Sequence, residues 1–261
     1  MHSALYVSQT GLAAQDKRLT AISNNLANVA TNGFKRDRVV FEDLLYQIQR
    51  QPGANSTQNT ELPSGLQLGT GVRVVGTQKI HTQGALQNTG EPLDAAINGR
   101  GFFEVQMPDG STSFTRDGQF HLSADGELVT ASGMLINPGL TVPQGAQSLT
   151  IGTDGVVTAA LPGQSQPVNI GNLTLVDFVN PAGLQALGGN LYAETVSSGN
   201  PQQSAPGTNG LGLIVQGSLE NSNVEVVEEL VDMITTQRAY EMNSRVISSA
   251  DQMLQFVTQN L

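Results

Sequence analysis

Apolar residues open the chain at a helical spacing. They recur every seven residues, with two more at a spacing of three, as in an a/d stripe. The members of this stripe are Leu5, Leu12, Leu19, Ile22, Leu26 and Val29. Ser8 and Gln15 interrupt it in the first half, and Asn32-Gly33 supplies a left-handed stop. The pattern predicts an N-terminal helix within residues 1–33 that ends near residues 30–32.

A second heptad pattern closes the chain. Its members recur every seven residues: Val226, Met233, Tyr240, Ile247, Leu254 and Leu261. Ser222 and Glu225 stand at the spacing of a capping box, and acidic residues follow in the early turns, where the helix dipole favours them. A seven-residue repeat of this length is typical of a coiled coil, so a helix over residues 222–261 is expected.

Between these patterns, apolar and polar residues alternate over short runs. Three Asp-Gly pairs separate such runs, at Asp109-Gly110, Asp125-Gly126 and Asp154-Gly155. An Asp-Gly pair in this context is a strong hairpin signal, because both residues tolerate the left-handed turn conformation. Further strands are expected at residues 72–80 and 173–179. Residues 71–196 are therefore predicted to form an antiparallel β domain.

Two polar stretches rich in Gly, Pro, Ser and Asn flank this β region. One falls within residues 34–70, interpreted as an extended segment and linker. The other spans residues 197–221 and is interpreted as a return linker. The predicted fold class is α+β, in which long N- and C-terminal helices form a coiled-coil or tube layer beside a central antiparallel β domain.

Composition narrows the possible functions. The 261-residue chain carries 12 Lys and Arg against 22 Asp and Glu, a net charge of -10, which disfavours nucleic-acid binding. Cysteine is absent, which excludes disulfides and thiol chemistry. No apolar run approaches roughly 18 residues, so no membrane insertion is expected. The first residues lack the basic start and apolar stretch of a Sec signal, so any export is expected without signal cleavage.

Recognisable catalytic and ligand-binding motifs are missing from the sequence. The three histidines, His2, His81 and His121, form no metal-binding pair, and there is no nucleophile elbow or phosphate-binding loop. We therefore expect no catalytic residue, no cofactor and no metal. A pair of carboxylates brought together in space, as in a glycosidase, stays open, although the sequence nominates no such pair.

The two terminal helices carry little apolar surface for their length. Burial yields roughly 1.5–3 kcal/mol per large aliphatic side chain, whereas ordering costs about 1–2 kcal/mol for every residue. Neither helix is expected to be stable alone, so several helical neighbours are needed. Residues 1–38 hold five basic and two acidic residues, and residues 222–261 hold two basic and six acidic ones. Helix pairing and two solvated faces both explain these opposite charges.

Asparagines gather near the end of the first predicted helix, at Asn24, Asn25 and Asn28. Asparagine is a poor helix former, because its amide competes for backbone hydrogen bonds. An amide both donates and accepts, so it can bond to a neighbouring helix without burying a charge. Exposure to water explains the same spacing equally well, and both interpretations stay open.

Two long motifs resemble those of a known family. NNLANVATNGFKRDRVVFEDLLYQ, residues 24–47, is similar to the N-terminal signature of the bacterial flagellar basal-body rod and hook family. SNVEVVEELVDMITTQRAYEMNSRVISSADQML, residues 222–254, resembles its C-terminal signature. INGRGFFEVQMPDGSTSFTRDGQF, residues 97–120, resembles the family's β domain, so the resemblance runs from end to end. Residues 41–73 resemble the segment after the first helix in distal-rod members.

The resemblance implies a structural subunit that polymerises helically into the hollow, rigid distal rod. This rod is a drive shaft across the periplasm that transmits torque to the hook. The terminal helices would line the inner tube, the β domain would form the outer wall, and residues 41–73 would brace one subunit against the next. The implied partners are further copies of the chain, proximal-rod and hook-side proteins, the rod cap, the P- and L-ring proteins and the flagellar type III export apparatus.

Sixteen residues are expected at subunit interfaces. They comprise the apolar stripe of the first helix, its asparagines, three apolar residues after that helix, and the stripe of the last helix. They are Leu5, Leu12, Leu19, Ile22, Asn24, Asn25, Leu26, Asn28, Val29, Phe41, Leu44, Leu45, Met233, Tyr240, Ile247 and Leu254.

Three other functions are weighed against this one. Within the family, the chain could be a proximal-rod or hook subunit. A β-domain adhesin oligomerised through coiled coils predicts a closed dimer or trimer of fixed size, whereas a rod subunit predicts a dilute monomer whose ends fold on assembly. A glycosidase acting on the cell wall predicts release of muropeptides.

Overall fold

The computed structural model describes residues 3–51, 53, 55–57, 60–61, 64–164 and 166–259. The predictions that involve His2 and Leu261 lie outside these residues. The chain forms two compact units, each built from separate pieces of sequence. Unit 1 contains residues 1–26, 37–78 and 225–261, and unit 2 contains residues 27–36 and 79–224. Terminal helices and a central antiparallel β region are present, so the α+β prediction is confirmed.

Helix α1 of unit 1 spans Ser3–Ala27. It ends before the predicted boundary because Asn28 starts a turn, in which its carbonyl accepts from the Thr31 N–H (3.2 Å). The Asn28 side chain also accepts from the Thr31 hydroxyl (3.2 Å), an example of an asparagine competing with helix continuation. Gly33 has a φ of 69°, so the left-handed residue lies where the sequence predicted it.

Helix α2 spans Val226–Gln259 and begins four residues after the predicted start. The predicted capping box is wrong, because the Ser222 hydroxyl instead accepts from the nearby Val224 N–H (3.3 Å). The first helical bond runs from the Glu229 N–H to the Glu225 carbonyl (3.0 Å). Glu228 and Glu229 occupy the first turn, as predicted, where the positive end of the helix dipole stabilises them.

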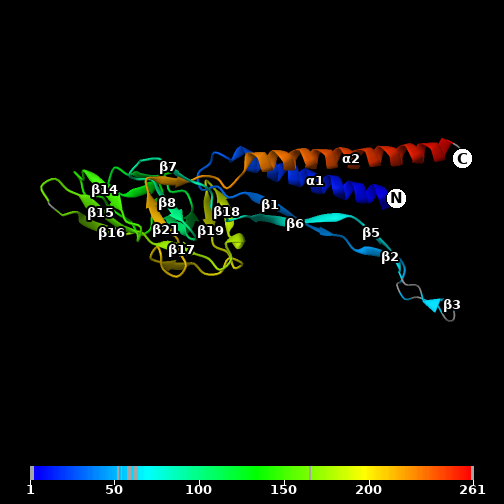
Figure 1. Ribbon diagram of the computed structural model, residues 1–261, viewed down its shortest axis with the longest axis horizontal. Helices are drawn as coiled ribbons and strands as arrows, with labels where there is room; N and C mark the ends of the chain where they lie inside the picture. The colour runs from blue at the N-terminus through cyan, green and yellow to red at the C-terminus, as the bar shows by residue number, and fades with distance from the viewer. Residues whose placement is uncertain are drawn as a thin grey trace. The chain divides into compact units, whose positions relative to one another are not determined.

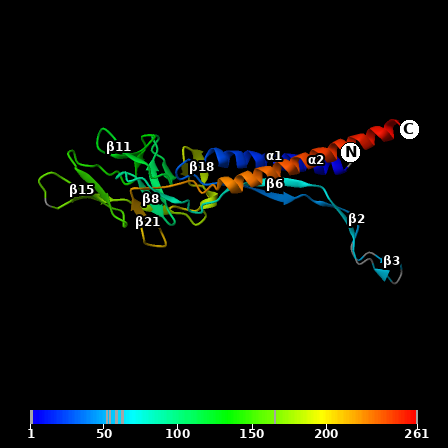
Figure 2. The ribbon, with the colours of Figure 1, turned by 45° about the horizontal axis from the view of Figure 1, so that its top comes forward.

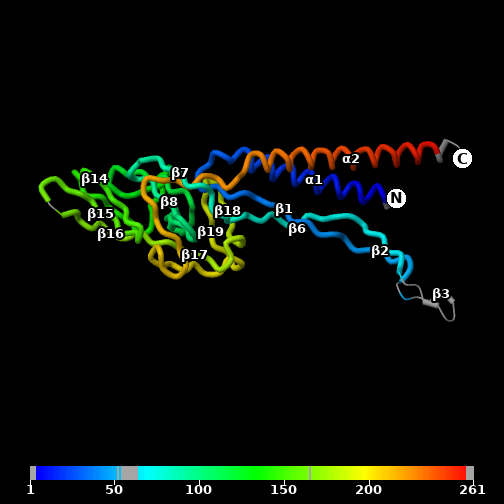
Figure 3. Tube along the Cα trace, viewed as in Figure 1, coloured from blue at the N-terminus to red at the C-terminus, as the bar shows by residue number. Residues whose placement is uncertain are grey.

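The helices of unit 1 lie side by side and run antiparallel, so the start of α1 and the end of α2 are at the same end of the pair (Figures 1, 2 and 3). Two-stranded ribbons complete the unit. They pair β1 (Asp37–Asp43) with β6 (Val72–Lys79), β2 (Tyr46–Arg50) with β5 (Leu66–Gly69), and β3 (Asn55–Thr57) with β4 (Thr60–Glu61). The segment interpreted as extended and linker thus forms ribbon, and the strand expected at residues 72–80 is confirmed as β6.

Unit 2 is built on a nine-stranded sheet in which β11-β12-β13-β9-β10-β19-β18 are neighbours and β17 joins β20 to β9. A three-stranded sheet, β14-β15-β16, and the pairs β8–β21 and β7–β22 complete it. The bounds are β7 (Leu86–Asn88), β8 (Ala95–Asn98), β9 (Phe102–Gln106), β10 (Thr112–Thr115), β11 (Phe120–Leu122), β12 (Leu128–Thr130), β13 (Leu135–Ile136), β14 (Ser148–Ile151), β15 (Val156–Ala160), β16 (Val168–Asn172), β17 (Leu175–Asp177), η1 (Pro181–Gly183), β18 (Gln185–Gly188), β19 (Leu191–Ala193), β20 (Gln202–Ser204), β21 (Leu213–Gln216) and β22 (Ser218–Glu220).

All three predicted hairpins are present. Asp109-Gly110 joins β9 to β10, Asp125-Gly126 joins β11 to β12, and Asp154-Gly155 joins β14 to β15. Each of these glycines has a φ between 80° and 87°, the left-handed conformation that the turn requires. The strand expected at residues 173–179 is present as the shorter β17.

The stretch 197–221, expected to be a return linker, contains strands β20, β21 and β22. These strands pair with β17, β8 and β7, respectively. The Gly and Pro residues that suggested a linker lie in the turns between them, as at Gly207 and Gly210, which both have positive φ. Turn composition therefore marked the connections correctly but concealed the short strands that they join.

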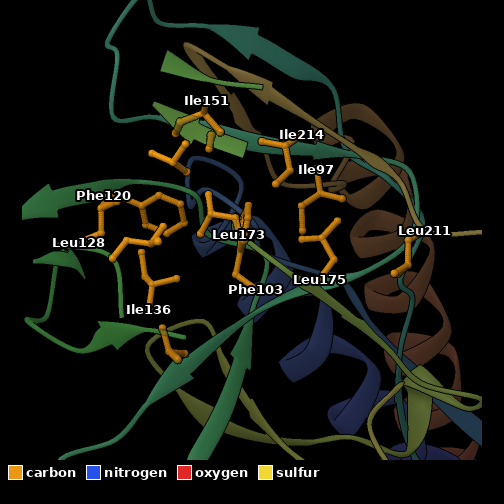
Figure 4. Packing of buried hydrophobic residues seen from close by; sticks show 14 of the residues in the cluster. Ile97, Phe103, Phe120, Leu128, Ile136, Ile151, Leu173, Leu175, Leu211 and Ile214 are labelled. Carbon is orange, nitrogen blue, oxygen red and sulfur yellow. The ribbon is translucent and has the colours of Figure 1, made fainter. Parts of the chain in front are cut away.

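The core of unit 2 is a cluster of aliphatic and aromatic side chains from the sheet and from β8, β15 and β21 (Figure 4). Phe103 and Phe120 meet edge to face there, with ring centroids 5.1 Å apart. A second cluster gathers Phe102, Phe114 and Phe178. The buried Phe and Tyr side chains of the described chain therefore lie in unit 2.

Candidate assembly interface

Three contacts define the register of α1 against α2. Asn25 reaches Glu229 (3.1 Å), and Arg18 reaches Asp232 (3.3 Å). Gly11 faces Asn243 so closely that a Cβ on Gly11 would lie 3.1 Å from the Asn243 amide nitrogen. The step from Asn25 to Gly11 equals the step from Glu229 to Asn243, so the pair keeps one antiparallel register along its length.

The seam between the helices is built from small and polar side chains. The most buried residues on α2 are Thr236, Glu229 and Ala250, and those on α1 are Asn25, Ile22, Ala14 and Ser8. Polar side chains fix the register of a helix pair because only one pairing satisfies them. The contact therefore gains specificity and gives up much of the apolar burial of an ordinary coiled coil.

Asn25 is the best-connected residue of this seam and is only 2% exposed. Its amide oxygen accepts from the Asp37 N–H (2.8 Å). Its amide nitrogen donates both to the Asp37 carbonyl (3.0 Å) and to a Glu229 carboxylate oxygen (3.1 Å). One side chain thus joins α1, the first residue of β1 and the first turn of α2.

The structure places the predicted interface residues in different surroundings. Ile22 is buried, whereas the other members of the N-terminal stripe, Leu5, Leu12, Leu19, Leu26 and Val29, are half-buried. Met233, Ile247 and Leu254 are half-buried, and Tyr240 is exposed. Asn24 is exposed and Asn28 half-buried. Phe41 and Leu44 are half-buried, and Leu45 is 90% exposed. Asn25 makes a contact between the helices, within one subunit.

Helix α2 carries a second apolar stripe that heptad analysis missed. Its members lie three, four, seven or eight residues apart, and the first three, Val227, Val231 and Ile234, lie on the side of α2 opposite the seam. They are Val227, Val231, Ile234, Met242, Val246 and Met253, and each is 48–76% exposed. The close spacing of the first three could have revealed this face in the sequence. Together with the half-buried heptad stripe of Met233, Ile247 and Leu254, it gives α2 apolar residues on two sides.

The β2–β5 ribbon presents a further group of exposed apolar side chains. These are Leu45, Tyr46, Ile48, Leu66 and Leu68, at 40–90% exposure. The strands pair in antiparallel register, with Tyr46 opposite Gly69. A hydrogen bond to the Asp43 carboxylate raises the pKa of Tyr46. An isolated two-stranded ribbon is at best marginally stable in water, so this one is suited to being covered.

Unit 2 contains a buried ionic cluster of Lys35, Glu220 and Arg116. Lys35 donates to Glu220 (2.5 Å) and to the Thr82 carbonyl (2.8 Å), and Arg116 Nε lies 3.2 Å from the other Glu220 oxygen. The Lys35 and Glu220 side chains are fully buried. Burial lowers the pKa of Lys35, which Glu220 partly opposes. Lys35 and Glu220 lie 185 residues apart, so no local sequence signal could have predicted the cluster.

The described chain shows neither a metal centre nor a membrane span. Among its described residues, no three His, Asp or Glu side chains are grouped to hold an ion. No described helix is long and apolar enough to cross a membrane. The features that stand out among the described residues are exposed apolar surfaces and a polar seam between the helices.

Three family profiles match separate parts of the sequence. The one described as "Flagella basal body rod protein" matches residues 5–35, "Flagellar hook protein FlgE/F/G D1 domain" matches residues 96–159, and "Flagellar basal body rod FlgEFG protein C-terminal" matches residues 215–260. The chain is 57% identical to flagellar basal-body rod protein FlgG of Buchnera aphidicola subsp. Schizaphis graminum, covering 99% of this chain and 100% of that one. The chain belongs to the flagellar basal-body rod protein family.

Further relatives support the same membership in the rod protein family. The FlgG of Caulobacter vibrioides is 46% identical, with 98% of each chain covered. The FlgG of Bacillus subtilis is 37% identical, with 98% of this chain and 97% of that one covered. In this chain, the first profile covers most of α1 and the turn after it, and the last covers β21, β22 and α2.

Proposed function

We propose that this rod family member is a structural, non-catalytic subunit that polymerises helically into the hollow, rigid distal rod of the flagellar basal body. The rod spans the periplasm and transmits torque to the hook. The observation that carries the proposal is that α2 bears apolar residues on two sides, the half-buried heptad stripe and the exposed outer stripe. A helix paired with a single partner needs one apolar face, whereas two faces suit a helix with neighbours on both sides.

The outer stripe of α2 has the character of a contact surface. Clustered, exposed apolar residues on a soluble protein mark places where another surface binds. Here the stripe begins at Val227 (76% exposed) and continues through Ile234 to Met253. A contact between this stripe and a different surface of the next copy is heterologous, and such contacts build filaments when the rotation between copies does not close.

The assignment to the distal rod rests on two supports. The relatives named FlgG match the chain over nearly its whole length and theirs. The exposed apolar ribbon β2–β5 also suits the bracing of one subunit by the next that residues 41–73 would provide. The sixteen interface residues given above, with the outer stripe of α2, are the proposed subunit contacts. A proximal-rod or hook subunit remains the alternative within the family.

The proposed partners follow from this place in the flagellum. They are other copies of the chain, the proximal-rod and hook-side proteins, the rod cap and the surrounding P- and L-ring proteins. Export would proceed through the flagellar type III apparatus without cleavage of a signal peptide.

A matched pair of substitutions tests the assembly surface. Val227→Asp places a charge on the outer stripe in the first turn of α2, where an acid is favourable for the helix itself. Val179→Asp places the same charge on an equally exposed valine of unit 2, 77% against 76%. Under conditions in which the wild-type protein forms tubes visible by cryo-electron microscopy, V227D is expected to stay unassembled while V179D assembles. Normal tubes from V227D would refute the role of this face.

Solution behaviour separates the rod subunit from the adhesin alternative. The dilute wild-type protein is expected to be monomeric by light scattering and to elongate into tubes of variable length as its concentration rises. A closed dimer or trimer that does not grow would favour the adhesin instead. In assembled tubes, the double variant Leu45→Ser/Ile48→Ser is expected to alter curvature or stiffness, and unchanged straight tubes would contradict the bracing role of the ribbon.

A further inference from the structure

Unit 2 contains a cavity of about 450 Å³ that the assembly surfaces do not use. Its walls include His81, Arg100, Arg116 and Asp177, together with the backbone at Gly99 and Gly101. A volume of this size falls within the range of small-ligand sites in proteins. The cavity therefore has room for a ligand group, and the character of its polar walls indicates which kind.

Arg116 forms the buried cationic wall of this cavity. Its side chain is 4% exposed, with Nη1 donating to the Gly101 carbonyl (2.8 Å) and Nη2 to the Gly99 carbonyl (2.7 Å). Nε faces a Glu220 oxygen at 3.2 Å. A guanidinium has five N–H donors, of which Arg116 uses two in these hydrogen bonds, while Nε makes an ion-pair contact with Glu220. Arg116 is thus held rigidly in place with donor capacity to spare.

The charges around Arg116 do not balance. Lys35 and Arg116 are two buried cations that share one buried carboxylate, that of Glu220. At the cavity wall, Arg100 pairs with Asp177 (2.9 Å), which adds no net charge. The buried cluster therefore carries a surplus positive charge beside the cavity, and a buried uncompensated charge is costly. An anion in the cavity would offset it.

His81 supplies a second unsatisfied polar group. Both of its ring nitrogens are buried without a hydrogen bond of good geometry to the described residues, although the Pro181 backbone interacts with the ring weakly enough to favour only slightly its protonated form. The ring stands edge-on to Phe102 and Tyr192, with centroids 5.6 Å away in each case. Burial, and to a smaller extent the charges of Lys35, Arg116 and Lys79, together lower the pKa of His81 to about 4. The imidazole is therefore neutral at pH 7 and has one N–H to donate.

We propose that this cavity binds a carboxylate group. A carboxylate matches the planar donor fork of an arginine, neutralises the surplus charge and accepts from the His81 N–H. Two sources share this chemistry: a small free carboxylate, or an Asp or Glu side chain of a second copy of the chain. The site lies within unit 2, so binding of a free carboxylate does not depend on the proposed helical assembly.

The first arm of the test follows the full-length protein by NMR at pH 7. Sodium succinate is titrated against sodium chloride of equal ionic strength while the Arg116 Nε–H and His81 ring signals are observed. Succinate is expected to shift these signals saturably, and chloride is not. An absent or non-saturable shift, or an equal one in chloride, overturns binding of a free carboxylate. The three histidines of the chain make the His81 signals readily assignable.

Two arginine variants test the location. Arg100→Gln leaves the Asp177 carboxylate without its partner, so Asp177 repels the ligand. Succinate affinity is expected to fall about tenfold, which corresponds to about 1.4 kcal/mol of interaction free energy. Arg73→Gln is the matched control, because Arg73 is equally exposed (64% against 65%) and also pairs with a carboxylate, that of Glu42. Equal affinities of wild type, R100Q and R73Q would overturn the location.

The pH dependence gives an independent readout. An anion beside the ring is expected to raise the pKa of His81 by about 1–3 units, because an opposite charge favours the protonated form. His81 should then titrate between pH 8 and pH 5 in the saturated protein but not in the free protein. This pH range lies above the isoelectric point of 4.6. The titratable groups around the His81 ring and its cavity are Lys35, Lys79, Arg100, Arg116, Asp177 and Tyr192. An unchanged His81 titration at saturation would overturn contact with the ligand.

The second arm separates the two sources. The same signals are followed without succinate while the protein concentration is raised through assembly. A His81 and Arg116 shift that matches the succinate-bound state identifies a carboxylate of a neighbouring copy as the ligand. A shift with succinate alone identifies a free carboxylate. If neither arm produces the shift, the cavity does not bind carboxylates and the proposal is wrong.

Discussion

Replacing Asn25 with alanine is expected to loosen unit 1 while leaving unit 2 intact. The substitution removes two bonds to the Asp37 backbone and one to the Glu229 carboxylate. Each bond to the half-buried Asp37 is worth about 1 kcal/mol, and the bond to the buried charge about 1.5–3 kcal/mol. Alanine returns roughly 0.6 kcal/mol through its better helix propensity. With the lower value for the bond to the charge, the net loss is about 3 kcal/mol.

Hydrogen exchange measured by mass spectrometry resolves such a local effect. A loss of about 3 kcal/mol corresponds to roughly 150-fold faster exchange for amides that open with α1 and the start of α2. Peptides from β9 and β10 in unit 2 should exchange at the wild-type rate.

Asn24→Ala is the matched control for this experiment. Asn24 is exposed, and its contact with the Asp37 carboxylate is long (3.4 Å), so its replacement should alter exchange much less than that of the buried Asn25. If Asn25→Ala and Asn24→Ala give the same exchange rates, the hydrogen bonds of Asn25 contribute nothing to the stability of unit 1 and the reasoning fails. Faster exchange spread evenly over both units would also refute it, because the bonds removed all belong to unit 1.

Three further substitutions have expected outcomes. Glu220→Gln leaves two buried cations without a counter-charge, so thermal unfolding should show unit 2 less stable by about 3–5 kcal/mol, and an unchanged melting temperature would contradict the account of the ionic cluster. His81→Phe should remove pH dependence: the unfolded protein binds a proton below about pH 6.5 and the folded one only near pH 4, so wild type loses on the order of 2–3 kcal/mol as pH falls through this window. Urea unfolding at pH 7 and pH 5 should show a smaller loss of unfolding free energy for His81→Phe than for wild type. Equal losses in the two proteins would contradict this. Gly11→Leu should force the helices apart at Asn243 and speed exchange in α1, whereas a wild-type rate would show that the seam is not close-packed there.

Local patterns predicted the elements of this fold well. The three Asp-Gly hairpins formed because each turn needs residues that tolerate positive φ, a requirement written into adjacent positions. The terminal helices followed from heptads that extend over several turns. Boundaries were less predictable, since the end of α1 depends on how Asn28 bonds with Thr31 and the start of α2 on the turn at Ser222.

The candidate interface was only partly accessible from the sequence. Heptad spacing located the leucine stripe of α1, but the most buried seam positions are small or polar residues such as Ser8 and Thr236, which carry no hydrophobic signal. The choice between solvent and helix contact at Asn25 depended on where Asp37 and Glu229 come to lie. Pairing between residues nearly 200 positions apart leaves no trace in local composition.

The separation of Lys35 from Glu220 also fixes an order of events in time. The ribosome supplies both buried cations long before it supplies the carboxylate that neutralises them. Until residue 220 emerges, closing unit 2 around Lys35 and Arg116 would trap two uncompensated charges, so an unfinished chain has a strong reason to stay open. A polypeptide whose unit 2 folds only when synthesis is almost complete stays unfolded until then, and an unfolded chain can pass through a narrow channel.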